Sequence, residues 1–163
     1  EVGYTQVAAL TTKKVDAVIG FTTNELVQLQ LAGANPRALS VAQGTVPLVS
    51  TCLLTTTAYA KAHPQVVRQV VQAVAAAIEA TAADQPKAID IAATQIPGWT
   101  AAARPSAEAV LKASIDLMDV RDGTFGPALD AAQWTQMAQF LESAQLIKAK
   151  VTATDAFTNS FAV

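Results

Sequence analysis

The stretch from Val15 to Leu29, read as VDAVIGFTTNELVQL, constrains the fold of this chain more than any other. Its first part, residues 15–19, is a short apolar run of the kind that a buried parallel strand shows. Gly20 ends this run, and the polar residues 22–25 then open a helix that carries leucines. The stretch therefore predicts a strand, a loop and a helix, which is the repeating unit of an open α/β sheet.

The loop of this unit is the part of the chain where we first expect a ligand. In an open α/β sheet, small ligands bind outside the carboxyl end of a strand, where the next helix begins. The residues expected to bind ligand there are Phe21, Thr22, Thr23, Asn24 and Glu25. A structural role competes for Glu25, because Thr22-x-x-Glu25 has the pattern of a capping box. Glu25 could also cap the helix in the free protein and contact ligand in the bound one.

Composition and charge disfavour two classes of partner. The chain has 163 residues, enough for a hydrophobic core, with a formal net charge of -2 and 15% charged residues. No Lys/Arg run is present to neutralise phosphates, so we expect no nucleic acid. The most apolar segment, Val66 to Ala83, is interrupted by polar side chains that include Arg68 and Glu79. We therefore expect no transmembrane segment.

The chain offers no motif for metal or nucleophilic chemistry. Cys52 and His63 are each single, which gives neither a disulfide framework nor metal-ligand spacing. Counted from Asp119, a calcium loop would need glycine at Thr124 and a bidentate glutamate at Asp130. No Ser/His/Asp, Cys/His or paired-carboxylate set reaches motif strength. We expect no catalytic residue, no metal site and no cofactor.

The pattern of apolar residues changes after Leu54. Before it we expect a helix from Thr5 to about Thr12, a helix from Asn24 that stops at Gly33, and short strands at Val2–Tyr4, Val15–Gly20, Ala38–Ala42 and Val46–Leu54. The first two strands with the helix between them predict a parallel βαβ unit. Because the chain begins inside an expected strand and without methionine, we expect it to be a piece of a longer chain.

After Leu54 the apolar residues recur with helical spacing. Helices are expected at 55–62, from Pro64, at 84–92, from Pro105 and after a cap at Asp130, with a loop at Arg121–Pro127. The last of these helices should turn inward the side chains of Trp134, Met137, Ala138 and Leu141. The tail, with Phe157 and Phe161, could be a short helix that docks back.

The order of these patterns resembles the second half of a type II periplasmic solute-binding protein of bacterial ABC importers. Three pieces carry the resemblance: AAL-x-x-x-x-VDA at residues 8–17, NE-x-x-Q-L at residues 24–29, and the helix from His63-Pro64 through Ala73. The ending QFLESAQLIKAKVTATDAFTNSF is also similar. The nearest branch includes binders of thiamine pyrimidine precursors, sulfonates and nitrate, although Leu26 stands where pyrimidine-binding relatives often carry proline.

This resemblance implies a two-lobed α/β protein that closes on its ligand like a hinge. Residues 1–45 would be the remainder of the second, ligand-binding lobe, and residues 46–163 a mostly helical return segment that completes the first lobe. The protein would be the substrate-binding component of an ABC importer, outside the cytoplasm in the periplasm or on a lipid anchor, with a membrane permease as partner. Since Glu25 disfavours an anion, we expect a small polar solute such as a pyrimidine or another amine-bearing heterocycle.

The alternative function is an enzyme of the same fold that synthesises a pyrimidine precursor. That activity would need a histidine and a cysteine-rich iron-binding segment, and neither pattern is visible in these residues. A plain helical interaction module is disfavoured by the strand, loop and helix at the start. Solute binding without catalysis is the leading interpretation.

Overall fold

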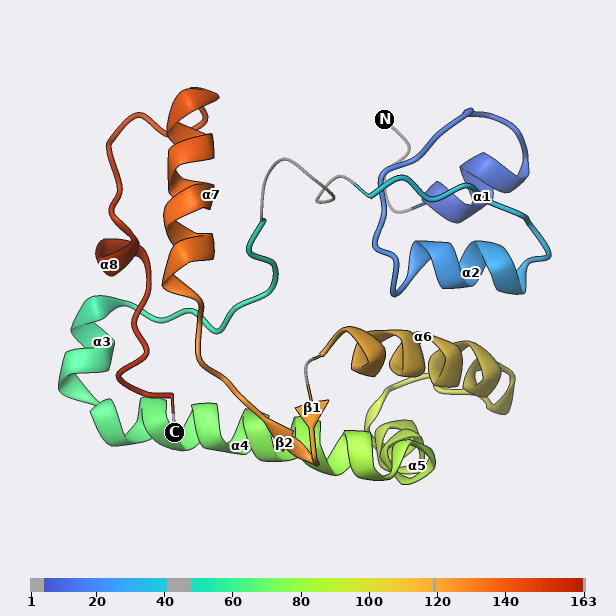
Figure 1. Ribbon diagram of the computed structural model, residues 1–163. Helices are drawn as coiled ribbons and strands as arrows, with labels where there is room; N and C mark the ends of the chain where they lie inside the picture. The colour runs from blue at the N-terminus through green and yellow to red at the C-terminus, as the bar shows by residue number, and fades with distance from the viewer. Residues whose placement is uncertain (1–4, 41–47, 119, 163) are drawn as a thin grey trace. The chain divides into compact units, whose positions relative to one another are not determined.

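A computed structural model describes residues 5–40, 48–118 and 120–162 (Figure 1). The chain forms two compact units, each built from two separate segments. The first unit comprises Glu1–Leu39 and Ile78–Phe125, and the second comprises Ser40–Ala77 and Gly126–Val163. The predicted division into lobes at residue 45 stays a prediction.

The first unit consists of helices and one β-hairpin. Its elements are α1 (Gln6–Thr11), α2 (Glu25–Leu31), the end of α4 (Pro64–Ala83), α5 (Gln85–Gln95), the 3₁₀ turn η1 (Ala101–Ala103), α6 (Arg104–Leu117), β1 (Val120–Arg121) and β2 (Thr124–Phe125). Helix α2 contacts α1 and α6, and α5 also packs on α6. The buried apolar side chains of the described residues, Ala9, Leu29 and Ile89, come one each from α1, α2 and α5. The core of this unit therefore lies among its helices.

The second unit contains α3 (Thr57–Ala62), α4 up to residue 77, α7 (Ala131–Ser143) and α8 (Ala153–Ala156). The ring of Trp134 on α7 stacks on Phe157, with centroids 5.3 Å apart and planes at 25°. Asn159 donates to the carbonyl of Leu129 and accepts from its N–H, at 2.9 and 2.8 Å. These contacts confirm that the tail docks back on the preceding helix.

Two local signals for the ends of helices, Asp130 and Gly33, are confirmed. Asp130 accepts from the N–H groups of Ala132 and Gln133 at the start of α7. Gly33, with φ +74°, closes α2 in a Schellman motif: its N–H bonds the carbonyl of Gln30, and the next N–H bonds that of Leu29, both at 3.0 Å. The inward face of α7 is also confirmed, because its half-buried positions are Trp134, Met137, Ala138 and Leu141.

The predicted parallel strands are wrong for the residues that the structure describes. No strand occurs at Val15–Gly20, at 38–40 or at 48–54, and the side chain of Ile19 is 88% exposed. The remainder of the last two predicted strands, and all of Val2–Tyr4, lie outside the described residues. A strand requires a neighbour for its backbone N–H and C=O groups and a surface that buries its side chains. No neighbouring strand stands beside residues 15–20 in the described part of the chain, so the apolar run stays single.

One hairpin forms where a loop was predicted. Strands β1 and β2 pair antiparallel, with Val120 opposite Phe125 and Arg121 opposite Thr124. Asp122 and Gly123 between them both have positive φ, as a type I′ turn requires. Glu79 on α4 accepts the N–H of Phe125 at 2.9 Å and ties the hairpin to the helix. Asp-Gly between alternating residues was the sequence signal that would have predicted this hairpin.

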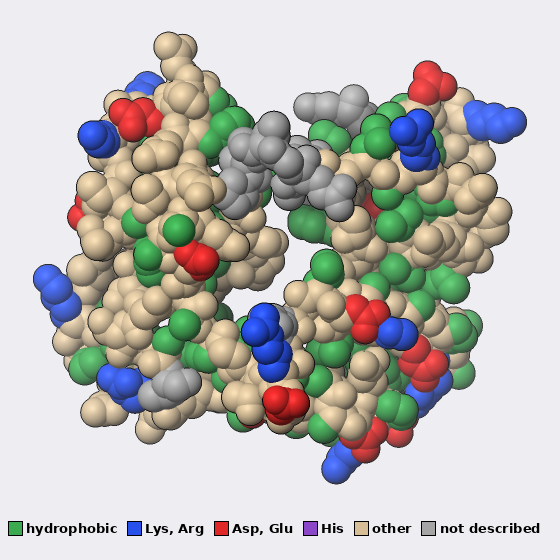
Figure 2. All heavy atoms as spheres, viewed as in Figure 1, with side chains coloured by type: hydrophobic (Ala, Val, Ile, Leu, Met, Phe, Trp, Pro, Cys, Tyr) green, Lys and Arg blue, Asp and Glu red, His purple; other side chains and the backbone are tan. Residues whose placement is uncertain are grey.

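Helix α4 is a 20-residue helix rich in alanine and valine. By length and composition alone it could cross a membrane, which is weak evidence because core helices of soluble proteins pass the same test. Val66, Val70 and Val74 follow one another at four-residue spacing and are exposed. Exposed hydrophobic side chains also lie elsewhere on the surfaces of the two units (Figure 2). The absence of a membrane-spanning segment stays a prediction.

Candidate functional site

The predicted ligand loop folds around the carboxylate of Glu25. Its Oε2 accepts the backbone N–H of Phe21 at 2.7 Å, and its Oε1 accepts an amide N–H of Asn24 at 2.9 Å. The carbonyl of Phe21 accepts the N–H groups of Asn24 and Leu26, at 3.2 and 3.3 Å. Both backbone groups of Phe21 are therefore bonded within the same turn, and Glu25 holds its N–H.

Gly20 lets the side chain of Glu25 come close to the backbone. A Cβ atom at residue 20 would lie 2.7 Å from Cβ and 2.9 Å from Oε2 of Glu25, both closer than real contacts allow. A side chain at this position would push the carboxylate away from the N–H of Phe21. The sequence indicated Gly20 only as the end of an apolar run, and this close approach is visible only in the structure.

The hydrogen bonds also fix the charge of the loop. The backbone N–H of Phe21 lowers the pKa of the Glu25 carboxyl below its ordinary value of 4.5, and burial opposes this in part. The side chain of Asn24 lowers the pKa further. Glu25 is therefore a carboxylate at neutral pH.

The capping-box interpretation of this loop is wrong. Helix α2 begins at Glu25 with Asn24 as its N-cap, and no side chain caps it. Glu25 is thus the first helical residue, and its side chain reaches back to Phe21 instead of to Thr22. The cause is the extra turn from Phe21 to Asn24, which places the helix start beyond the position that the Thr22-x-x-Glu25 pattern indicated.

The five predicted site residues lie together in this turn and differ in exposure. The ring of Phe21 is 69% exposed, Thr22 and Asn24 are exposed, and Thr23 and Glu25 are half-buried. An exposed ring and an exposed amide beside a half-buried carboxylate can stack on, and hydrogen-bond to, a flat polar molecule. That these residues bind ligand stays a prediction.

A hydrogen bond to a residue far away in the sequence holds the helix that follows the loop. Gln28 on α2 donates from Nε2 to Oγ of Ser106 on α6 at 2.7 Å. Leu29, next along α2, is 3% exposed. Ser106 is 78 residues from Gln28, and no local pattern in the sequence indicated that the two would meet.

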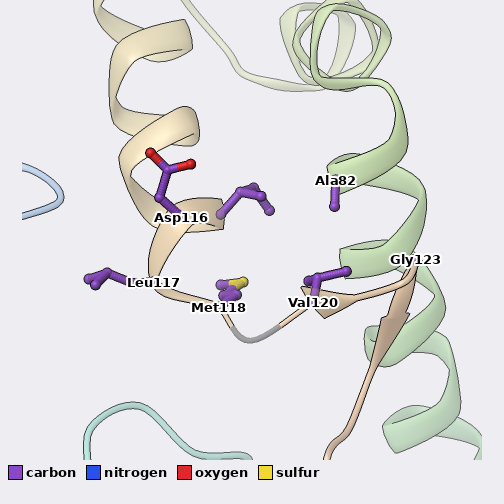
Figure 3. A pocket seen from close by; sticks show the side chains of 7 residues that line it. Ala82, Asp116, Leu117, Met118, Val120 and Gly123 are labelled. Atoms are coloured by element: carbon purple, nitrogen blue, oxygen red, sulfur yellow. The ribbon is translucent and has the colours of Figure 1, made fainter.

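A separate open pocket lies at the far end of α6. It has a volume of about 720 Å³ and lies between the end of α6, the hairpin and α4 (Figure 3). Its lining comprises Ala82, Ile115, Asp116, Leu117, Met118, Val120 and Gly123. The carboxylate in this lining already accepts from Lys112 at 2.7 Å. None of the predicted ligand residues lines this pocket. Among the described residues, no group of three or more His, Cys, Asp or Glu side chains could hold a metal ion.

Comparison with known proteins shows that a part of the chain that includes the loop matches a sequence family. A family model described as "NMT1/THI5 like" matches residues 1–88, which is more than half of the 163-residue chain. The chain is also 29% identical over 163 residues to a protein named riboflavin-binding protein RibY from Chloroflexus aurantiacus. That match covers 99% of this chain and 46% of the relative, so the chain spans about half the length of the relative. No solved structure matches the chain.

Proposed function

The chain belongs to the NMT1/THI5-like family, and on that premise we propose that it is part of the substrate-binding component of an ABC importer. A solute-binding role is supported by the family and by the relative named as a riboflavin-binding protein. The observation that carries the proposal is the family match itself, because it includes the whole loop from Gly20 to Glu25. A membrane permease would be the partner, and binding would take place outside the cytoplasm.

The proposed solute is a small polar molecule with a flat heteroaromatic ring, such as a pyrimidine, an amine-bearing heterocycle or a flavin. The flavin is included because of the printed name of the relative. Phe21 offers an exposed ring face for stacking, and Asn24 offers amide groups for the polar edge of such a ring. Thr22, Thr23 and Glu25 complete this chain's share of the site. The charge on Glu25 disfavours sulfonate and nitrate.

Calorimetric titration of the intact protein tests this proposal. The panel would be riboflavin, 4-aminopyrimidine, methanesulfonate and nitrate. We expect saturable binding of at least one heterocycle and none of the two anions. The variant Phe21→Ala should weaken the heterocycle, while Phe140→Ala, which removes an exposed ring on α7, serves as the matched control. Binding of an anion, or of no member of the panel, would contradict the proposal.

A further inference from the structure

We propose that Glu25 is a positioning residue of the solute site: it sets the Phe21 ring and the Asn24 amide for a flat solute with an N–H donor, and does not itself touch the solute. The inference rests on the proposed function and assigns different roles within the predicted loop. It follows from where the two carboxylate oxygens, the glycine and the exposed ring lie.

Both oxygens of Glu25 are already used by the loop. Oε2 accepts from the N–H of Phe21 and Oε1 from the amide of Asn24, at 2.7 and 2.9 Å. The stem of the side chain lies so close to Gly20 that no Cβ fits between them. A charged acceptor bonded on both oxygens and held from behind gains little by exchanging these donors for those of a solute. The geometry of Glu25 therefore suits holding the loop in place better than contacting a ligand.

The bonds of Glu25 decide what its neighbours present. The N–H of Phe21 is bonded to the carboxylate, so the backbone is fixed while the ring remains 69% exposed. Exposing a phenyl ring forfeits the free energy of its burial, which a stacked solute would restore. A carboxylate only accepts hydrogen bonds, so Asn24 must turn its NH₂ group toward Glu25. Within the described residues, the Oδ1 atom of Asn24 has no hydrogen-bond partner and is left to accept from a solute N–H.

These placements specify the chemistry of the solute. The face of Phe21 takes an aromatic ring, and the carbonyl oxygen of Asn24 takes an N–H at the edge of that ring. A net positive charge is not required, because Glu25 does not pair with the solute. Displacing the Glu25 carboxylate while keeping its charge should therefore weaken the binding of cationic and neutral rings that share an N–H donor by the same factor.

Substitution Glu25→Asp in the intact protein separates positioning from contact, because it keeps the charge and shortens the side chain. The probes are 4-aminoquinoline, a cation at neutral pH, and 4-quinolone, which is neutral and has a ring N–H. Both are flat two-ring heterocycles. We expect both dissociation constants to rise by about tenfold or more and by the same factor, since one hydrogen bond to a charged group is lost. The matched control is Glu108→Asp, an exposed glutamate on α6, which should leave both constants unchanged.

Each other outcome has a defined meaning. A loss confined to 4-aminoquinoline would overturn the inference, because it would show Glu25 pairing with the positive charge. No loss with either probe would also overturn it. If Glu25→Asp lowers the melting temperature, Gly20→Ala is the second variant, and it should weaken both probes equally since it displaces the same carboxylate.

A nuclear magnetic resonance measurement keeps the inference separate from the proposed function. The amide proton of Phe21 should shift as acid protonates Glu25, and in Glu25→Asp it should resemble the acid form at pH 7. An unmoved resonance would overturn the positioning role. Failure of the wild-type protein to bind either probe, with the shift present, would count against the proposed solute class and leave the role of Glu25 in the loop supported.

Discussion

At the scale of a single residue, Glu25 makes the stability of the ligand loop depend on pH. Its folded-state pKa is lowered from 4.5, mainly by the N–H of Phe21. A carboxyl group with a depressed pKa adds stability above its unfolded value, and that stability is lost as the pH falls through the folded value. The loop should therefore be tied down at neutral pH and released in acid.

This pH dependence can be measured by comparing the wild-type chain with Glu25→Gln in urea unfolding from pH 7 downward. We expect the wild type to be more stable at neutral pH and the difference to shrink as the pH falls below 4.5, because the unfolded chain then binds a proton that the folded carboxylate takes up only at lower pH. The substitution Glu142→Gln on α7 is the matched control for the loss of a glutamate outside the loop. A difference that stays constant down to the acid limit would contradict the bond between Glu25 and Phe21.

At the scale of elements, helix α7 is held by its cap and by one aromatic contact. Asp130 satisfies two N–H groups of its first turn. Trp134 is half-buried and stacks on Phe157 from the tail, and Asn159 holds the segment before the helix through Leu129. A helix of this length depends on such packing more than on intrinsic propensity.

The substitution Trp134→Ala should lower the free energy of unfolding by about 2–3 kcal/mol, less than the 3–5 kcal/mol typical of a fully buried tryptophan. The reason is that the ring is half-buried and loses one stacked partner. Trp134→Phe keeps a ring for Phe157 and is the control, with a loss of less than half as much. Urea unfolding followed by circular dichroism measures both. A melt that Trp134→Ala leaves unchanged would remove the ring from the packing of α7.

At the scale of the whole molecule, large apolar side chains remain exposed throughout the described chain. Ile19 and Leu54 are 88% and 89% exposed, and Leu39 and Phe21 are 76% and 69% exposed. Side chains this exposed forfeit the free energy of burial that a covering segment would restore. The chain also corresponds to 46% of the length of its relative. On these two facts we propose that one wall of the solute site is built by residues other than these 163.

We therefore predict that the 163-residue chain alone binds the preferred member of the solute panel at least about 100-fold more weakly than the intact protein. A solute pocket normally encloses 70–90% of its ligand, and a single exposed loop supplies only part of that area. Parallel calorimetric titrations of the two proteins measure the ratio. Phe21→Ala should weaken the intact protein, which shows that the loop contributes. Equal affinities would contradict a site shared with other residues.

The amino-acid sequence by itself determined the helices and most of their ends. The cap at Asp130, the stop at Gly33 and the inward face of α7 each depend on residues within a few positions of one another. Such interactions exist wherever the segment is placed, so local patterns suffice to predict them. The sequence also placed Phe21 to Glu25 in one loop before a helix, and the resemblance to solute-binding proteins is confirmed by the family match.

Only the tertiary structure decided which apolar runs became strands and how the loop is held. Residues 15–19 have strand character but no neighbouring strand in the described chain. The turn at Asp122-Gly123, in contrast, brings the two segments that flank it together, and they pair as the hairpin β1–β2. The bond from Gln28 to Ser106 joins residues 78 apart. The contact of Glu25 with Gly20 depends on how the intervening turn closes. Strand pairing and side-chain contacts require a second segment close by in space. Sequence periodicity indicates which residues can form such contacts, but not which segments lie next to them.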